Sequence, residues 1–381
     1  MTLILCVVCI TISVIVIAIT RNKNKSKNEN VYFPPKDALN SSQRKPSYSK
    51  SPVASVSDRS VPVETPVSQP PITRQTVNSA NQTLLTGQAL QGGKYRIVRM
   101  LGQGGFGITY LAEQTMMERK VCVKEFFMKE YCNRDGVTSQ VSLGTQNNAA
   151  MMQKYQEKFL KEARMIARLD HPNIIRIHDV FAENNTAYYV MDYIEGKNLN
   201  EIVKERGALP EAVAVEYVRQ IGEGLEYVHS HNINHLDIKP GNILIRKSDN
   251  RPILIDFGMS KQYNESGDQT SSTPVGVSAG YAPLEMYQAG GVTSFSPQTD
   301  VYELGATLYY LVTRTVPPSA SNILNEGLTD IPKYLSPSIK TAIEQAMEPV
   351  KKNRPASIRG FLVLLSALKE EEDVDDATVL I

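Results

Sequence analysis

The sequence predicts an α+β fold that follows a membrane-spanning helix and a disordered linker. Three observations lead to this prediction. The chain opens with a long uncharged apolar run, continues through a polar stretch, and then alternates apolar and polar residues before helical spacing appears. Its 381 residues are 41% hydrophobic and 21% charged, which is typical of a globular protein of one or two structural units with appendages.

Charge and cysteine content exclude several classes of protein. The 41 Lys and Arg side chains nearly balance the 40 Asp and Glu side chains, and the net charge of +1 argues against a nucleic-acid-binding polycation. Four cysteines without a C-x-x-C pair exclude a disulfide framework and offer no zinc site. We therefore expect reduced thiols and no nucleic-acid partner.

Residues 2–20, TLILCVVCITISVIVIAIT, contain no charged side chain. As a helix of about 1.5 Å per residue they would span roughly the hydrocarbon core of a bilayer. A cleaved signal peptide is the alternative, but no basic residue precedes the run, whereas Arg21, Lys23, Lys25 and Lys27 follow it. This charge pattern predicts a single-pass anchor in the cell membrane, with the N-terminus outside and the rest of the chain cytoplasmic.

The segment 21–90 is rich in Ser, Thr, Asn, Gln and Pro and poor in aromatic residues. Such a composition buries too little apolar surface to offset the entropy of ordering, so we predict a disordered linker. We expect the folded unit to span 91–368. The acidic segment 369–381 is expected to be a tail outside the fold.

The folded unit opens with KYRIVRMLGQGGFGITYLAE, whose alternation around a glycine cluster predicts strand, loop and strand. Gly102, Gly104 and Gly107 satisfy G-x-G-x-x-G, a spacing that lets backbone amides approach phosphate oxygens. A dinucleotide-binding fold also uses this motif, but a helix should then follow the glycines. The strand-like ITYLAE that follows argues against that alternative.

Two further segments carry candidate charged groups. VCVKEFF is another alternating run and contains Lys124, which could neutralise phosphate charge beneath the glycine loop. The next segment, EKFLKEARMIARLDHPNII, places Phe159, Ala163, Ile166 and Leu169 at helical spacing. Glu162 lies in this helix, where the residues alone leave open a solvated surface carboxylate or a site residue.

The densest cluster of chemically active residues is HLDIKPGNILI, which holds His235, Asp237, Lys239 and Asn242. The apolar run RPILI then ends in D-F-G, where the acidic residue is Asp256. Together these residues could supply one proton acceptor and two oxygen ligands for a metal ion. Magnesium prefers such hard oxygen ligands and is usually held by one or two protein groups plus substrate phosphates.

In order, the chain carries the glycine loop, VCVK, a helix glutamate, H-x-D-x-K-x-x-N, DFG, the APE-like APLE and DVYELG, and it therefore resembles eukaryotic-type protein kinases. The segment GQGGFGITYLA resembles the corresponding segment of bacterial Ser/Thr kinases. The resemblance implies a bilobal fold: a small antiparallel sheet with one main helix (91–191), a hinge (192–196) and a larger helical lobe (197–368).

The resemblance also implies residue roles in ATP- and Mg²⁺-dependent phosphoryl transfer. Asp237 would accept the proton of the acceptor hydroxyl, and Lys239 would steady the γ-phosphate. Asn242 and Asp256 would hold magnesium. Nucleotide contacts would come from the glycine-loop region, from Lys124 with Glu162 as its ion-pair partner, and from the hinge: Leu101, Gly102, Gly104, Gly105, Phe106, Gly107, Thr109, Lys124, Glu162, Met191, Asp192 and Ile194.

Supporting roles are implied for three buried groups. Asp300 would fasten the catalytic loop from a central helix, and Glu285 with Arg354 would form an ion pair that braces the large lobe. Ser278 would support Ser/Thr acceptors, although the extra Leu284 in APLE leaves the register uncertain by one residue.

Two departures from the family pattern stand out. Leu236 replaces the Arg that usually binds a phosphorylated activation loop, so we expect activity that is independent of phosphorylation in the segment 259–281. The stretch between Lys124 and Glu162 is about twice the usual length, and its extra residues, 131–150, are predicted to form a surface loop or hairpin of unknown role.

The expected function is phosphorylation of Ser/Thr hydroxyls on protein substrates by a membrane-tethered kinase. A pseudokinase scaffold is one alternative. Such scaffolds usually lack one of five residues needed for the chemistry, and here all five are present: Lys124, Glu162, Asp237, Asn242 and Asp256. A small-molecule phosphotransferase of related fold is the other, although those enzymes generally lack DFG and the APE-like segment. Thr378 in the acidic tail is a candidate docking site for a phosphothreonine-reading partner.

Overall fold

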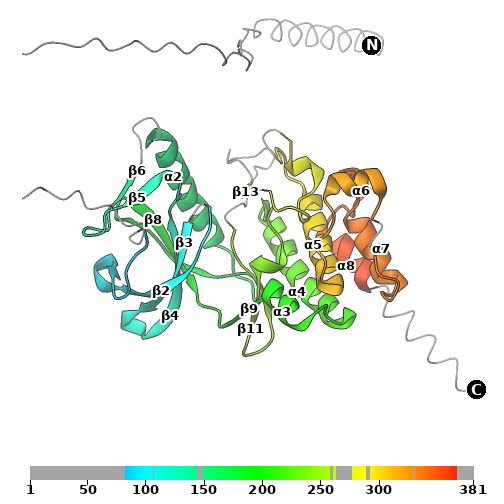
Figure 1. Cartoon of the computed structure of the whole chain (residues 1–381), viewed down its shortest axis with the longest axis horizontal. Coiled ribbons are helices and arrows are strands. Elements are labelled where there is room, and N and C mark those ends of the chain that lie inside the picture. Colours follow the sequence, from blue (N-terminus) through cyan, green and yellow to red (C-terminus); the bar gives the residue numbers. More distant parts are fainter. Residues whose placement is uncertain are drawn as a thin grey trace, which may run out of the picture. The chain divides into compact units, whose positions relative to one another are not determined.

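The computed structural model describes residues 82–105, 107–143, 149–257, 261–262, 277–288, 292–328 and 331–366 (Figure 1). The predicted anchor at 2–20, most of the linker, Phe106, most of the activation segment and the tail with Thr378 lie outside these ranges. No helix in the described part of the chain is both long and apolar enough to cross a bilayer.

An antiparallel sheet of six strands forms the small lobe, in the order β1-β2-β3-β4-β8-β7. Alternation in the sequence matches the sheet faces: Tyr95 and Ile97 are buried, whereas Arg96 between them is exposed. The strands are β1 (Ala89–Leu90), β2 (Tyr95–Gln103), β3 (Gly107–Gln114), β4 (Arg119–Phe126), β7 (Ile177–Glu183) and β8 (Thr186–Asp192).

Residues 82–90 belong to the folded unit, which corrects the linker boundary expected at residue 90. Leu84 and Leu90 are 4% and 0% exposed, and β1 pairs with the start of β2. The Leu84 N–H donates to the Tyr110 hydroxyl (3.1 Å). Two apolar residues and a two-residue strand are too short for periodicity to reveal them within a polar segment.

The extra stretch forms the hairpin that the sequence predicts, with β5 (Cys132–Arg134) paired to β6 (Val141–Leu143). It is not only a surface feature, because Cys132 and Val141 are 1% and 2% exposed. Arg134 reaches the buried Glu125 of β4 with an N–O distance of 2.5 Å. A buried charge can be held only by a partner of this kind, so the hairpin is part of the small-lobe core.

Helix α2 (Ala149–Ile166) packs along strands β7 and β8, as Figure 1 shows. Its apolar spacing works as predicted: Ala163 and Ile166 are buried, and Phe159 stacks on Tyr189 with ring centroids 5.1 Å apart. This packing places the next face of the helix, with Glu162, toward Lys124 on β4.

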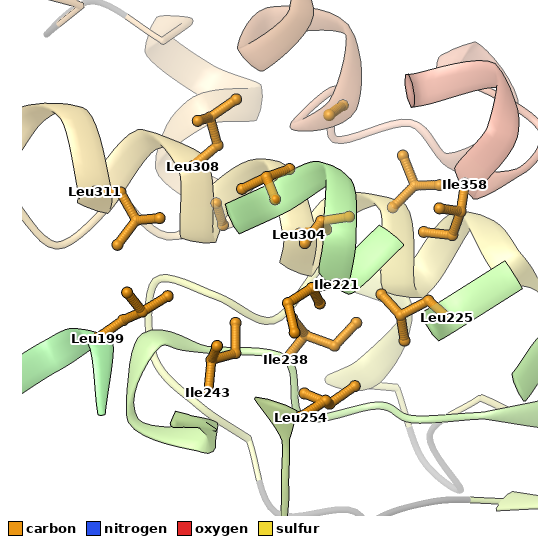
Figure 2. Close-up of a cluster of buried hydrophobic side chains, with 14 of the residues drawn as sticks. Leu199, Ile221, Leu225, Ile238, Ile243, Leu254, Leu304, Leu308, Leu311 and Ile358 are labelled. Atoms are coloured by element: carbon orange, nitrogen blue, oxygen red, sulfur yellow. The ribbon is translucent and has the colours of Figure 1, made fainter. Parts of the chain in front are cut away.

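The large lobe is built around helix α5 (Pro297–Thr313), in which every residue from Thr299 to Val312 is buried. A helix that is buried all round lies inside the core. Figure 2 shows Leu304, Leu308 and Leu311 of α5 in one apolar cluster with residues of the surrounding elements. The other helices are α3 (Leu199–Arg206), α4 (Glu211–Ser230), α6 (Ala320–Glu326), α7 (Pro337–Ala346) and α8 (Ile358–Ser366).

Short strands carry the candidate catalytic segments. β9 (Gly196–Asn198), β11 (Ile243–Arg246) and β12 (Pro252–Leu254) form one antiparallel sheet, and β10 (Ile233–Asn234) pairs with β13 (Lys261–Gln262). His235 to Asn242 lie between β10 and β11, and Asp256 follows β12 by two residues. Because β11 and β12 are adjacent, residues distant in sequence meet at one end of the sheet.

Candidate active site

The Asp237 carboxylate lies at the centre of the site. Lys239 Nζ is 2.8 Å from both of its oxygens, and the Asn242 side-chain amide donates to Oδ2 at 2.9 Å. The Ser278 hydroxyl donates to Oδ1 at 2.7 Å. The three residues expected from H-x-D-x-K-x-x-N are therefore brought together around one proton-accepting group.

Ser278 links the end of the activation segment to the catalytic loop. Besides its hydrogen bond to Asp237, it accepts a hydrogen bond from Lys239 Nζ at 2.9 Å. These contacts place Ser278 beside Asp237, and its expected role in supporting Ser/Thr acceptors stays a prediction. The hydroxyl occupies a position where an acceptor hydroxyl could meet the same carboxylate and ammonium groups.

Asp300 fastens the catalytic loop from helix α5, as the resemblance implies. It is fully buried and accepts hydrogen bonds from the N–H groups of His235 and Leu236, each at 2.9 Å. His229 Nε2 lies 2.7 Å from Oδ2, the oxygen that also accepts the His235 N–H. Burial alone would raise the pKa of Asp300, but His229 and these donors outweigh it and lower the pKa, so the residue stays ionised.

Asn242 and Asp256 are joined through the backbone, because the Ile255 N–H donates to the Asn242 carbonyl at 2.9 Å. Both hydrogen bonds from the Asn242 side chain use Nδ2, which leaves Oδ1 as an oxygen ligand. The Asp256 carboxylate is 43% exposed. One carboxylate and one amide oxygen fit a magnesium ion that takes its remaining ligands from water and phosphate. These two residues would hold it.

The described residues contain no cluster of three or more His, Cys, Asp or Glu side chains that could bind a metal ion by itself. A magnesium ion at Asn242 and Asp256 would take its remaining ligands from water and from substrate phosphates. This is the usual arrangement for magnesium in phosphoryl transfer and differs from a preformed structural metal site.

The glycine loop joins β2 to β3 above Lys124. The Gly104 N–H donates to the Gly107 carbonyl at 2.8 Å, which closes the turn. A Cβ atom on Gly107 would lie 2.4 Å from the Glu125 carbonyl oxygen, so only glycine fits there. Thr109 pairs with Lys124 across β3 and β4, which fixes the lysine directly beneath the loop.

The expected ion pair between Lys124 and Glu162 is not formed, which corrects the sequence-based assignment. Lys124 Nζ contacts Asp256 instead. Glu162 Oε1 lies 3.4 Å from Nζ of Lys158, four residues earlier on the same helix. A partner one helical turn away needs no tertiary arrangement, whereas Lys124 lies on a separate element.

The electrostatics of this region follow from burial. Burial raises the pKa of Glu162 to about 7, and Lys158 only partly opposes the shift. Burial alone would lower the pKa of Lys124, but the Asp256 carboxylate outweighs it and the net pKa is raised. Lys124 is therefore charged at neutral pH, whereas Glu162 exists as a mixture of acid and carboxylate.

The hinge residues lie at the end of β8, next to the strand that carries Lys124. Met191 pairs with Cys122 and Asp192 with Val121 across β4 and β8. Asp192 also contacts His178 Nε2 at 2.6 Å. Met191, Asp192 and Ile194 are partly exposed, and their contact with adenine stays a prediction.

The predicted brace of the large lobe is confirmed. Arg354, 3% exposed, donates two hydrogen bonds to Glu285, at 2.7 and 3.1 Å. Thr299 adds a hydrogen bond to the same carboxylate at 3.0 Å. This bidentate geometry is the strong form of an Arg–carboxylate pair.

Leu236, which stands in place of the Arg expected from the family pattern, belongs to an apolar cluster. Its side chain is fully buried with Ala282, Met286 and Val292. A guanidinium group would have to be accommodated among these apolar atoms. Independence from loop phosphorylation stays a prediction, because residues 258–260 and 263–276 lie outside the described part of the chain.

Sequence reasoning missed two residues that contact this machinery. Glu303 of α5 accepts the Ile238 N–H, and Lys158 is the partner of Glu162. Glu303 occupies the variable position of DVYELG, so the motif gave it no role. The i, i+4 spacing of Lys158 and Glu162 was the one signal in the sequence that could have indicated their pairing.

A proton acceptor, a flanking lysine, two oxygen ligands and a lysine beneath a glycine loop define the class of phosphoryl-transfer enzymes. Comparison with known proteins gives the family. Residues 95–371 match the model described as the protein kinase domain. The chain therefore belongs to the protein kinase family, and its domain is that of a serine/threonine protein kinase.

Bacterial serine/threonine-protein kinases are among the curated relatives. Serine/threonine-protein kinase PknA of Nostoc sp. is 33% identical over 288 residues, covering 73% of this chain and 48% of the relative. Serine/threonine-protein kinase PrkC of Bacillus subtilis is 29% identical over 267 residues, covering 68% and 37%. The chain thus spans about half or less of the length of these relatives. A solved structure titled "PpkA-294 apo form" covers 74% of this chain and 99% of its own, with a TM-score of 0.62 and 26% identity.

Proposed function

We propose that the protein is an active kinase that transfers the γ-phosphoryl group of ATP to Ser and Thr hydroxyls of protein substrates. The observation that supports it most is the Asp237 carboxylate with Lys239, Asn242 and Ser278 around it. A carboxylate held by three donors keeps one orientation and can accept the proton of a hydroxyl that enters beside Ser278.

The surrounding residues have separate tasks in this proposal. Lys239 lies beside Asp237. Its positive charge would stabilise the negative charge that develops on the oxygens of the transferred phosphoryl group. Lys124 binds phosphate oxygens once it is released from Asp256. Magnesium, bound at Asn242 and Asp256, would neutralise phosphate charge.

The experiment is phosphate transfer from labelled ATP, with magnesium, by the full-length chain in detergent on a generic protein acceptor. Asp237→Asn should lower the rate by about 10²- to 10⁴-fold, because it removes the proton acceptor. Asp249→Asn, an exposed change in the same lobe, serves as the control. Label on Ser and Thr supports the proposal. Equal rates in parent and Asp237→Asn would contradict it. No phosphate transfer by either form would favour a scaffold.

The acceptor is what separates a protein kinase from a small-molecule phosphotransferase. Protein substrates are favoured by the match of residues 95–371 to the protein kinase domain and by the position of Ser278 beside Asp237. Phosphoamino-acid analysis of the labelled acceptor should find phosphoserine and phosphothreonine. Label recovered only in small molecules would contradict this part of the proposal.

The proposal includes tethering to the cell membrane through residues 2–20, with the kinase domain in the cytoplasm. Support comes from the uncharged run and the basic residues that follow it. The full-length protein should float with membranes and resist alkaline carbonate, whereas a chain lacking residues 2–20 should be extracted. Equal extraction of both forms would contradict the anchor.

Thr378 is proposed as a docking site for a phosphothreonine-reading partner after phosphorylation. Its acidic sequence context, DDATV, is the support. Mass mapping during robust autophosphorylation should find phosphate on Thr378. Its absence there would remove this part of the proposal.

A further inference from the structure

The backbone around the catalytic base is held by a complete set of hydrogen bonds. Asp300 accepts the N–H groups of His235 and Leu236, and the Asp237 N–H faces His235 Nδ1 at 3.3 Å. The next N–H, that of Ile238, donates to Glu303 Oε2 at 2.8 Å. Each peptide from His235 to Ile238 therefore has a fixed donor direction, and Glu303 supplies the last of these contacts.

Glu303 and Asp300 lie three residues apart on α5 and so share one face of the helix. Both are buried, with exposures of 1% and 0%. Asp300 holds the peptides before Asp237, and Glu303 holds the peptide that links Asp237 to Ile238. The two carboxyl groups thus hold the base from both sides of its position in the chain.

Glu303 is a costly residue to place in this core. Burial, together with the neighbouring Asp300, raises its pKa well above the usual range. An apolar side chain of similar size would avoid this penalty but would leave the buried Ile238 N–H without an acceptor. Fixing that N–H is the contact that only a side chain with an acceptor oxygen can make.

We propose that Glu303 is a positioning residue for phosphoryl transfer: by accepting the Ile238 N–H it fixes the peptide after Asp237 and thereby the direction of the Asp237 carboxylate. The inference rests on the proposed kinase activity for its rate measurement. Glu303 itself does not touch the reacting atoms. It acts through the peptide plane that carries Asp237 into the ring of Lys239, Asn242 and Ser278.

The test compares two variants of the full-length chain that differ in whether the side chain at position 303 has an acceptor oxygen. Glu303→Gln keeps an acceptor oxygen, whereas Glu303→Leu keeps the size and removes the acceptor. Thr307→Val is the matched control, because Thr307 is also fully buried on α5 and its hydroxyl has no hydrogen-bond partner within the described structure. For each form, kcat, KM for ATP and the thermal midpoint are measured.

We expect Glu303→Leu to lower kcat by about 10- to 100-fold, with KM for ATP within about threefold of the parent, because a misdirected base slows the chemical step more than nucleotide binding. Glu303→Gln should recover kcat to within about threefold, and Thr307→Val should match the parent. An unchanged kcat in Glu303→Leu, or equal losses in the Leu and Gln variants, would overturn the proposal.

A second measurement does not depend on activity. Amide hydrogen exchange should show faster exchange across residues 235–242 in Glu303→Leu than in the parent, with protection restored in Glu303→Gln. Unchanged protection in Glu303→Leu would overturn the proposal even in an inactive protein. A parent without transferase activity but with this exchange pattern would contradict the proposed function and leave the positioning contact supported.

Discussion

The two lobes differ in how completely their parts of the candidate site are assembled. In the large lobe, Asp237 is surrounded by donors, and Asp300 and Glu303 hold its backbone from a helix that is buried on all sides. In the small lobe, Lys124 and Glu162 each contact another partner. The carboxylate expected to be the base is thus held in place, whereas the lysine expected to bind nucleotide is paired with Asp256.

The physical reason lies in the kinds of groups that meet. In the large lobe, short carboxylate side chains accept backbone N–H groups, so few rotatable bonds have to be fixed. In the small lobe, the expected contact joins two long side chains from separate elements, and each has a rival nearby: Asp256 for Lys124, and Lys158 for Glu162. The pairing of Lys124 with Glu162 therefore depends on how helix α2 lies against the sheet.

The largest effect is expected from Asp300→Ala in the large lobe. It leaves the N–H groups of His235 and Leu236 and the ring of His229 without their acceptor, at about 1–3 kcal/mol for each buried donor. The free energy of unfolding should fall by at least about 3 kcal/mol in urea titrations, the lower end of the sum over these three donors. Asp249→Ala, an exposed carboxylate, should change it by less than about 1 kcal/mol. Similar values for the two variants would show that the loop is held by other contacts.

The next effect is expected in the small lobe, from Arg134→Met. The Arg134 and Glu125 side chains are 2% and 0% exposed, so the change leaves a buried carboxylate without its cation, a loss of about 3–5 kcal/mol. Urea unfolding of the full-length chain measures it. Arg219→Met, in a pair that is more than 40% exposed, is the control and should cost about 1 kcal/mol or less. A loss below about 1 kcal/mol for Arg134→Met would mean that the hairpin does not support the small-lobe core.

The smallest of the three effects concerns the pH dependence of Glu162. Its pKa rises from an ordinary 4.5 to about 7, so between these values the folded state keeps a proton that the unfolded state releases, and stability falls as pH rises. Glu162→Gln cannot lose that proton. Its stability relative to the parent should therefore grow by about 3 kcal/mol across this interval, at about 1.4 kcal/mol per pKa unit.

Unfolding of parent and Glu162→Gln at a series of pH values tests this expectation. Glu157→Gln, an exposed glutamate on the same helix, is the control and should show a flat difference. A flat difference for Glu162→Gln as well would mean that the Glu162 carboxyl is solvated, and that helix α2 lies differently against the sheet.

Much of the large-lobe site could be predicted from sequence because its residues lie close together along the chain. His235 to Asn242 lie between β10 and β11, and Asp256 follows β12, the partner of β11, by two residues, so local structure brings them near each other. Asp300 and the pair of Glu285 with Arg354 followed from the family pattern and are confirmed. The contact of Glu303 could not be predicted, because the local sequence does not show that a helix residue accepts a hydrogen bond from a backbone N–H in another part of the chain.

In the small lobe, sequence gave the elements but not their contacts. The strands around the glycine loop and the helix with Phe159 and Ala163 were expected, and so was a hairpin in the extra stretch. The burial of Leu84 and Arg134 was not, because each lies in a mostly polar segment and its partner lies on another strand, Tyr110 on β3 and Glu125 on β4.

The sequence by itself determined the family, the order of the elements and the residues that carry the chemistry, because residue type and spacing along the chain are what define glycine turns, alternating strands and catalytic motifs. Only the tertiary structure decided which charges pair. Lys124 meets Asp256, Glu162 meets Lys158, Arg134 meets Glu125, and Glu303 meets the backbone of Ile238. Two of these four contacts, Lys124 with Asp256 and Glu303 with Ile238, join distant parts of the chain. In all four, burial and distance, which packing sets, select one partner among several possible ones.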